Sequence, residues 1–326
     1  MRFPTALLMS ALLLGSGTGT AYGQEDRADE PITPIPTTVD VRPDKARLGE
    51  RLFNDVRLSR GGVVACSTCH RLDAGGADNQ ALAAGLDGRP LDFNTPSIFN
   101  IALDALLDWR GNYRTIEAQN AAVLRDARIM DTDWASLLAA LRADAAYRAG
   151  FVAIYRAEPG REEVIDSLAA FQRSLLTPNS RFDRYLRGEP HALSAEEQRG
   201  YELFKSYGCV ACHQGVNVGG NLYQRFGVFA DPFAGRPERQ ADLGRFVLTG
   251  DPADRHVFRV PSLRNVALTA PYFHNGSASS LSDAVTVMAR SQLGRTLPRT
   301  DTALIVGFLR TLTGEYRGHT LAEPGR

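Results

Sequence analysis

Apolar residues along this chain recur mainly at intervals of three and four positions, the spacing of one face of an α-helix. This pattern predicts helices over residues 134–148, 162–176, 281–291 and 301–312. Runs in which apolar and polar residues alternate are scarce, so we expect few and short strands. The pattern therefore predicts a mostly α fold.

Breaks in the helical pattern indicate two domains. One helix should begin at Ser194-Ala195-Glu196-Glu197, a capping box with Ser194 as the N-cap and Glu197 at N3. Before it, the turn-forming residues of 176–180 and 188–190 place a domain boundary near 178–193. We expect domains over residues 45–180 and 190–326, since 44% hydrophobic residues is enough to build two cores.

The first residues of the chain resemble an export signal. Met1-Arg2 gives a short basic start, residues 6–14 are apolar, and Ala21-Tyr22-Gly23 forms a small-x-small cleavage site. Residues 1–23 are thus a predicted signal peptide, and no later stretch approaches the roughly 20 apolar residues of a membrane helix. We expect a soluble periplasmic protein in which the polar, proline-rich residues 24–44 form an extended arm.

The pentapeptide Cys-x-x-Cys-His occurs twice, as Cys66-Ser67-Thr68-Cys69-His70 and Cys209-Val210-Ala211-Cys212-His213, and uses every cysteine of the chain. Each copy supplies two thiols for thioether bonds to one haem and a histidine for its iron. Disulfides, a zinc site or a thioredoxin-like redox pair would also use cysteines, but none of them explains the histidines. The motifs are also too far apart for a zinc ribbon. Two covalently bound haem c groups are therefore predicted.

A similar segment precedes each haem motif, residues 49–53 in the first half and residues 200–204 in the second, both beginning with glycine and ending in Leu-Phe. This weak repeat indicates duplication of a cytochrome unit.

The charge balance of the chain limits the kinds of partner that it could bind. Lysine plus arginine equals aspartate plus glutamate at 37 each, and the signal peptide contains only Arg2 of these, so nothing in the balance favours nucleic-acid binding.

Several further segments are specific to one family: residues 48–53, 94–100 and 260–276, and Trp109-Arg110-Gly111 with Gln119. With both haem motifs, they make the chain, from about Leu48 to Arg317, resemble the bacterial dihaem cytochrome c peroxidases and the related MauG-type enzymes, which oxidise residues in a partner protein. The resemblance implies two cytochrome c-like haem domains packed together. The N-terminal one would be peroxidatic and the C-terminal one would transfer electrons.

The resemblance also implies the iron ligands. His70 and His213 would each bind one iron, and Met288 stands where the family supplies the other ligand of the C-terminal haem, methionine in the peroxidases and tyrosine in MauG. Without the signal peptide only Met130 and Met288 remain as thioether candidates, and a core role is the alternative for each. Thioether ligation would raise the potential of this haem above that of a bis-histidine haem, which suits the site where electrons enter.

Between the two haems the family places a calcium ion and a tryptophan. Asn94 matches the side-chain calcium ligand, while Thr269 and Pro271 match residues that offer backbone carbonyls, and such oxygen ligands suit a hard cation. Trp109 matches the bridging tryptophan, and Trp134 is expected to be an ordinary core residue.

The first domain departs from the family at two places. Residues 71–90, where family members carry a histidine that caps the N-terminal iron, contain none. We therefore expect a five-coordinate or water-bound haem that needs no reductive activation. Ile129 stands where family members have a glutamate that moves the peroxide proton, and an alkyl side chain cannot act as an acid or base. Gln119, Asp126, Arg128 or an ordered water could substitute; Arg128 is preferred because a cation there would stabilise developing negative charge.

The predicted function is reduction of hydrogen peroxide to water by a periplasmic enzyme that takes electrons from a small cytochrome c or a cupredoxin. Catalytic roles are predicted for Gln119, Arg128 and Trp109. A MauG-like oxidase of a partner protein is the second hypothesis, which Met288 disfavours, and a dihaem electron carrier or sensor is the third. Family members often form homodimers. Of the other histidines, we expect His274 to be structural and the remaining three, His191, His256 and His319, to be exposed.

Overall fold

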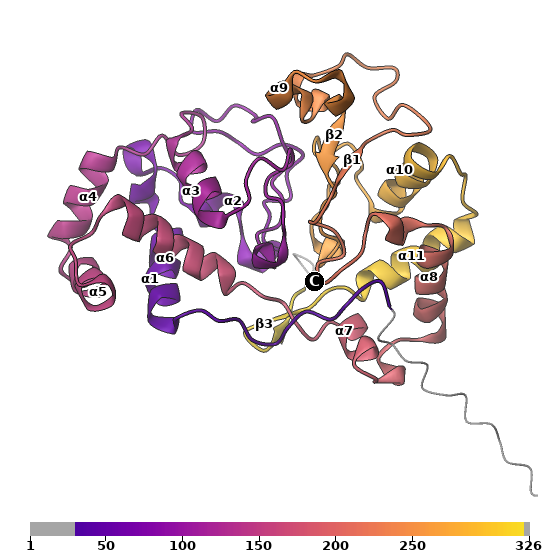
Figure 1. Cartoon of the computed structure of the whole chain (residues 1–326), viewed down its shortest axis with the longest axis horizontal. Coiled ribbons are helices and arrows are strands. Elements are labelled where there is room, and N and C mark those ends of the chain that lie inside the picture. Colours follow the sequence, from indigo (N-terminus) through magenta and orange to yellow (C-terminus); the bar gives the residue numbers. More distant parts are fainter. Residues whose placement is uncertain (1–29, 323–326) are drawn as a thin grey trace, which may run out of the picture. The chain divides into compact units, whose positions relative to one another are not determined.

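The computed structural model describes residues 30–322, and helices make up most of its regular structure (Figure 1). This confirms the mostly α fold with few short strands. The strands form two antiparallel sheets of two strands each, β1 with β2 and β3 with β4, and Tyr223 pairs with Arg259 in the first. The helices are α1 (Pro43–Phe53), α2 (Cys66–Cys69), α3 (Ile116–Arg125), α4 (Trp134–Ala143), α5 (Ala145–Tyr155), α6 (Arg161–Arg173), α7 (Arg181–Leu186), α8 (Ala195–Ser206), α9 (Phe246–Thr249), α10 (Leu281–Leu293) and α11 (Arg299–Arg310), and the strands are β1 (Tyr223–Arg225), β2 (Val257–Arg259), β3 (Glu315–Tyr316) and β4 (His319–Thr320).

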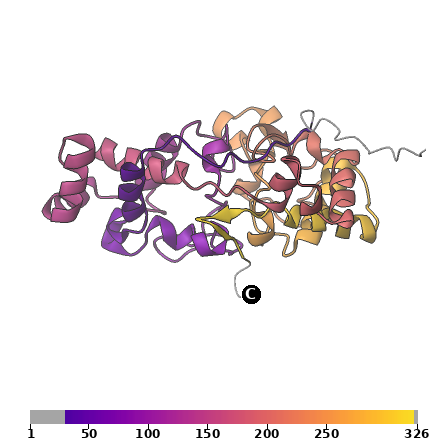
Figure 2. The ribbon, with the colours of Figure 1, turned by 90° about the horizontal axis from the view of Figure 1, so that it is seen from below.

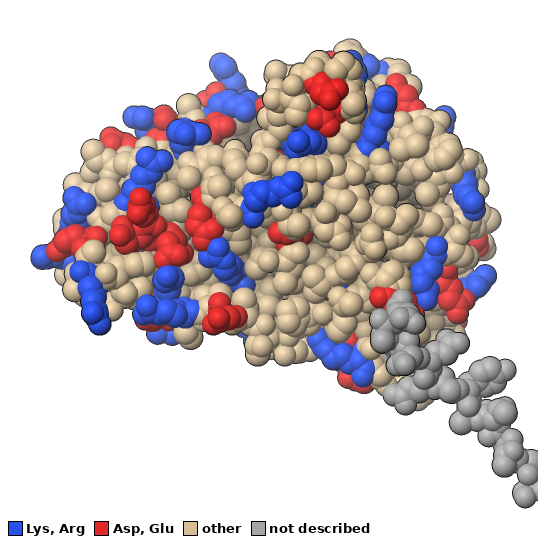
Figure 3. Space-filling model, viewed as in Figure 1, with Lys and Arg blue, Asp and Glu red and all other residues tan. Residues whose placement is uncertain are grey.

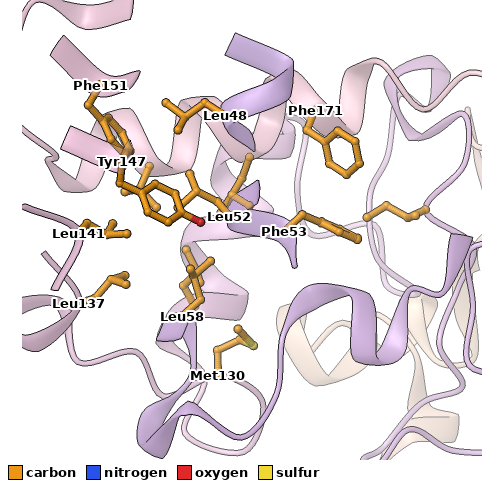
Figure 4. Packing of buried hydrophobic residues seen from close by; sticks show 14 of the residues in the cluster. Leu48, Leu52, Phe53, Leu58, Met130, Leu137, Leu141, Tyr147, Phe151 and Phe171 are labelled. Atoms are coloured by element: carbon orange, nitrogen blue, oxygen red, sulfur yellow. The ribbon is translucent and has the colours of Figure 1, made fainter. Parts of the chain in front are cut away.

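Two large clusters of buried hydrophobic residues organise the chain. The first, drawn in Figure 4, joins side chains of α1, α4, α5 and α6, and it includes Met130 beside Leu58. The second joins side chains of α7, α8, α10 and α11 around Phe182 and Phe308. We call the parts built on these clusters the N-terminal and C-terminal lobes. The domain boundaries themselves stay a prediction.

The internal repeat of the sequence corresponds to a repeated helix pair. Gly49 of α1 lies against α6, where an added Cβ would be 1.9 Å from the carbonyl oxygen of Ser167. Gly200 of α8 lies against α11 in the same way, with the carbonyl oxygen of Leu304 at 2.1 Å. Only glycine permits such close contact between the two helix backbones. Each haem motif follows the first helix of its pair, so the two halves of the chain share this helix arrangement as well as the sequence repeat.

A second pair of equivalent residues joins the lobes. Asn100 and Asn265 both have left-handed backbone angles, with φ of 61° and 59°. Their side-chain amides both donate to the hydroxyl of Thr177, at 2.7 and 2.9 Å. All three residues are buried. Thr177 thus binds the corresponding turn of each lobe, at the point where the chain passes from one lobe to the other.

The described part of the predicted arm is extended, and it is fastened to the C-terminal lobe before the chain enters α1 (Figure 2). Ile32 and Ile35 are each 1% exposed. The amide of Ile35 donates to Asp183 at 3.1 Å, and Arg264 donates to the carbonyl of Thr33 at 2.9 Å. The arm is therefore an integral part of the lobe. The predicted signal peptide lies outside the described residues.

Helix boundaries confirm most of the sequence predictions. The capping box of α8 is present, since Ser194 and Glu197 each bind the other's backbone amide. The prediction of one helix over residues 134–148 is wrong. Asp144 ends α4 and caps α5, because its carboxylate accepts hydrogen bonds from the amides of Ala146 and Tyr147. Within residues 30–322 no helix is long and apolar enough to cross a membrane.

Candidate functional site

The second haem motif borders a cavity of about 430 Å³ in the C-terminal lobe. Cys209, Cys212 and His213 contribute to its lining from the segment that follows α8, and Met288 contributes from α10. The sequence therefore brings both cysteines and both predicted iron ligands to one cavity. Much of the remaining lining is apolar and includes Phe204, Phe258, Leu263, Val266, Ile305 and Leu309.

His213 is held in the form that binds metal. Its Nδ1 lies 3.3 Å from the carbonyl oxygen of Val218, so Nδ1 donates and Nε2 keeps its lone pair. Burial lowers the pKa of His213 to about 4, which keeps the ring neutral at physiological pH. Neutral imidazole with one nitrogen fixed by a carbonyl is the usual state of a metal-binding histidine.

The first haem motif repeats this arrangement in the N-terminal lobe. Nδ1 of His70 lies 3.2 Å from the carbonyl oxygen of Gly76, and burial lowers its pKa. No disulfide joins the four cysteines, and the two pairs belong to different lobes. Burial raises the pKa of Cys66 to about 12 and of Cys209 to about 11. A redox-active cysteine pair would need a lowered pKa, so the residues fit haem attachment better than thiol chemistry.

The side chains predicted to act at the first haem are in different environments. Gln119 lies on α3, and its Oε1 is buried without a hydrogen-bond partner within residues 30–322. A buried amide oxygen without a partner is uncommon, and such an atom usually accepts a hydrogen bond from an ordered water or a small polar ligand. Arg128 is exposed and pairs with Asp92 at 3.0 Å, so nothing in its contacts directs it inward. Ile129 packs against the N-terminal cluster.

The loop that lacks a histidine is fixed by backbone hydrogen bonds. The backbone amide of Ala83 donates to the carbonyl of Phe93, that of Gly85 to Arg89, and that of Leu86 to Arg128, at 2.8 to 3.1 Å.

The histidines outside the two haem motifs differ in their exposure. His191 and His319 are exposed as predicted, and His274 is buried. The prediction that His256 is exposed is wrong: its side chain is 15% exposed, its ring packs on Phe233, and its Nδ1 bonds the carbonyl of Asp242.

The residues predicted to lie between the haems also line the cavity. They are Asn94, Trp109, Thr269 and Pro271. The indole N–H of Trp109 donates to the carbonyl of Asn94 at 2.8 Å, which fixes the ring relative to that segment. Nearby, Asn79 donates to the carbonyls of Leu268 and Ala270, on either side of Thr269, and its own buried Oδ1 has no partner within residues 30–322. Amide and carbonyl oxygens are the ligands that a hard cation prefers, so these residue types are compatible with such an ion.

A buried polar network beside Trp109 was not predicted in detail. His274, 2% exposed, stacks on Phe258 and bonds Asp242 at 2.8 Å, while Arg236 binds the same carboxylate through two nitrogens. Burial alone would raise the pKa of Asp242, but these hydrogen bonds outweigh it and hold that pKa well below its usual value. Burial lowers the pKa of His274 to about 4. A neutral imidazole therefore lines the cavity, and the charged carboxylate of Asp242 holds it in place.

A second unpredicted pair is Arg259 and Asp104. Both line the cavity, and they form an ion pair of 2.7 Å whose side chains are 6% and 8% exposed. Arg259 also donates to the carbonyl of Asp108 at 2.8 Å. The partners are 155 residues apart in sequence, so no local pattern pointed to them.

Comparisons with known proteins identify one family. The family described as di-haem cytochrome c peroxidase matches residues 43–191. The chain is 37% identical to the cytochrome c551 peroxidase of Nitrosomonas europaea over 310 residues, 95% of this chain and 92% of that protein. It is 36% identical to the cytochrome c peroxidase Ccp of Escherichia coli over 300 residues, 90% of this chain and 64% of that protein. A solved structure of a MauG-like protein associated with microbial copper homeostasis superimposes with a TM-score of 0.77 at 29% identity, covering 94% of this chain and 100% of that one.

Proposed function

Since the chain belongs to the di-haem cytochrome c peroxidase family and is an oxidoreductase that acts on peroxide, we propose that it reduces hydrogen peroxide to water in the periplasm. The overall reaction takes up two electrons and two protons for each peroxide and forms two waters. Two molecules of a one-electron donor, a small cytochrome c or a cupredoxin, would supply the electrons. Haem iron, when bound, supplies the redox chemistry that cleaves the O–O bond.

In the N-terminal lobe, His70 would bind one iron through Nε2, because Nδ1 is engaged by the carbonyl of Gly76. Of the other histidines of residues 30–322, His213 would bind the second iron, His256 and His274 are engaged with Asp242, and residues 71–90, where family members carry the capping histidine, contain none. The opposite face would thus be open to peroxide without prior reduction of the protein.

Gln119 is the residue we assign to peroxide. Its unpartnered Oε1 would accept a hydrogen bond from the peroxide or from a water beside it, which removes the penalty of a buried oxygen without a partner. An amide is not a strong acid or base, so a water held by Gln119 would have to move the proton that a glutamate moves elsewhere in the family. Arg128 is less suited because it is on the surface and paired with Asp92.

In the C-terminal lobe, His213 and Met288 would bind the second iron, where electrons enter. Trp109 lines the same cavity, and its indole N–H donates to the carbonyl of Asn94, which follows the first haem motif in the chain. It is therefore suited to relay electrons between the lobes. A calcium ion would be held by Asn94, Thr269 and Pro271 and would fix this junction. The observation that supports the proposal most is the convergence of His213, Met288 and Trp109 on one cavity.

A MauG-like oxidase of a partner protein is the second candidate, favoured by the similarity to the MauG-like structure. Steady-state assays of the holoprotein separate the two. A peroxidase oxidises two molecules of reduced cytochrome c for each peroxide consumed, with continuous turnover. Peroxide consumption without oxidation of cytochrome c or a cupredoxin would contradict the preferred function.

A further inference from the structure

One exposed apolar feature lies at the rim of the cavity that holds Met288. Val228 lines the cavity and is 52% exposed, and the next residue, Phe229, is 67% exposed. Within residues 30–322, Phe229 is the only aromatic side chain in the exposed class. Isolated exposed hydrophobic residues need no explanation, but this pair is adjacent to the site where electrons would enter.

The pair is held rigidly against α10. The amide of Phe229 donates to the carbonyl of Ser291 at 2.9 Å. The side chain of Gln292 accepts from the amides of Gly227 and Val228 and donates to the carbonyl of Arg225 at 2.9 Å. These bonds fasten residues 225–229 to the helix that carries Met288. A preorganised apolar surface loses little conformational entropy when a partner covers it.

Gly294 shows how closely Phe229 approaches the end of α10. This residue caps the helix with a φ of 63°, and an added Cβ would lie 2.9 Å from the Phe229 ring. The ring therefore rests on the backbone of the cap while its other face remains exposed. The position of Phe229 is thus determined by packing as well as by hydrogen bonds.

The two segments that carry the pair and its contacts on α10 are mostly positive. Residues 225–231 and 288–299 contain four arginines and one acid, Asp231. Arg225, Arg290 and Arg295 are exposed, and Arg225 and Arg290 form no ion pair within residues 30–322. Figure 3 shows the surface over α10 as largely uncharged, with basic side chains near its edges. An apolar centre with a charged rim is the usual composition of a protein interface.

We propose that Val228 and Phe229, with Arg225, Arg290 and Arg295 around them, are the docking surface for a redox protein whose own docking face is acidic. This inference rests on the proposed function, because it assigns the electron donor of the same reaction. The arginines attract an acidic face and increase the association rate, while the apolar pair excludes water at the contact. Each encounter transfers one electron, so the donor is oxidised once and two encounters serve each peroxide.

The test compares two reduced donors with the holoprotein, a plastocyanin with an acidic docking face and a cytochrome c with a lysine-rich one. The rate with each donor is divided by the rate of the same variant with hydroquinone, a small neutral reductant. We expect wild type to favour plastocyanin, and kcat/KM for plastocyanin to fall at least about tenfold in Phe229→Ser and in Arg225→Glu/Arg290→Glu, mainly through KM. The charge-reversed variant should favour the lysine-rich donor instead.

Matched controls are Val152→Ser, at a valine 45% exposed on α5, and Arg89→Glu, at an arginine whose side chain is 87% exposed. Both should keep the wild-type rate ratio. A wild-type preference for the lysine-rich donor, or test variants that behave like the controls, would overturn the docking surface while leaving the peroxidase function intact. If wild type is inactive even with hydroquinone, the proposed function fails. NMR titration of oxidised plastocyanin then still tests docking, and equal binding by wild type and the charge-reversed variant would overturn it.

Discussion

The buried ion pair between Asp183 and Arg264, which also binds the arm, allows a quantitative prediction of how much it stabilises the protein. Both side chains are 0% exposed, and they meet at 2.8 Å. The Asp183 carboxylate also accepts from the amides of Ile35 and Ser180, at 3.1 and 3.2 Å. The variant Asp183→Asn retains the shape and can retain the neutral hydrogen bonds, but it leaves the Arg264 guanidinium buried without a counter-charge.

Removing one partner of a buried pair destabilises a protein by about 3–5 kcal/mol. At roughly 2–4 °C per kcal/mol, this corresponds to a fall of about 6–20 °C in Tm, and the length of the chain favours the lower half of that range. The measurement is thermal unfolding of the holoprotein followed by circular dichroism.

The control is Glu202→Gln, which breaks an exposed pair with Arg199 in which both side chains are 60% exposed. It should change stability by less than about 1 kcal/mol. Arg264→Met tests the pair itself: the double variant Asp183→Asn/Arg264→Met should be less unstable than the sum of the single variants. A change in Asp183→Asn no larger than in the control would show that the buried pair does not stabilise the fold.

Four further predictions follow from single sites. Gly200→Ala should destabilise the protein by about 1–3 kcal/mol, because its Cβ would meet the carbonyl of Leu304 at 2.1 Å, whereas Gly307→Ala, with no atom within 4 Å of the added Cβ, should be neutral or stabilising in the same urea titration. Met288→Leu should remove the absorption band of a thioether-bound ferric haem and lower its potential, while Met130→Leu, in the hydrophobic cluster, should leave both as in wild type. Calcium at about 100 times its Kd should stabilise wild type by about 2.7 kcal/mol in thermal unfolding, and Asn94→Leu should lose that increment; an equal increment in both would exclude Asn94 as a ligand. Burial alone would raise the pKa of Asp55, but hydrogen bonds from Arg57 and Tyr147 outweigh it and lower that pKa, so the stabilisation is complete above the ordinary value of 3.8 and is lost as pH falls through the lowered one. Asp55→Asn should therefore be less stable than wild type at pH 7, and the difference should shrink as the pH falls below 3.8 and through the lowered pKa; a difference that stays constant in acid would contradict the assignment.

The features that sequence could predict are those encoded by neighbouring residues. The haem motifs, the capping box at Ser194 and the repeated glycines are all local patterns, and the structure gives each of them a specific contact. Met288 and Trp109 were assigned by resemblance, and both line the cavity with His213. Their roles as ligand and relay remain predictions.

The features that sequence could not predict depend on distant partners. Asp183 and Arg264 are 81 residues apart, and His274 and Asp242 are 32 apart, so nothing in their local context distinguishes them from surface charges. Asp144 was misread because an aspartate within an apolar periodic stretch is compatible with a helix interior as well as with a cap. Arg128 was chosen from the sequence because its positive charge could stabilise developing negative charge on peroxide. In the structure it is exposed and pairs with Asp92, a contact that the sequence did not indicate.

We expect the oxidised protein to react with peroxide without prior reduction, because residues 71–90, where family members carry the histidine that caps the first iron, contain no histidine. Stopped-flow spectroscopy of the fully oxidised holoprotein mixed with hydrogen peroxide measures this reaction. The ferric Soret band should be lost rapidly and should return when reduced cytochrome c or cupredoxin is added and oxidised. An oxidised protein that does not react with peroxide would show instead that the first iron is blocked.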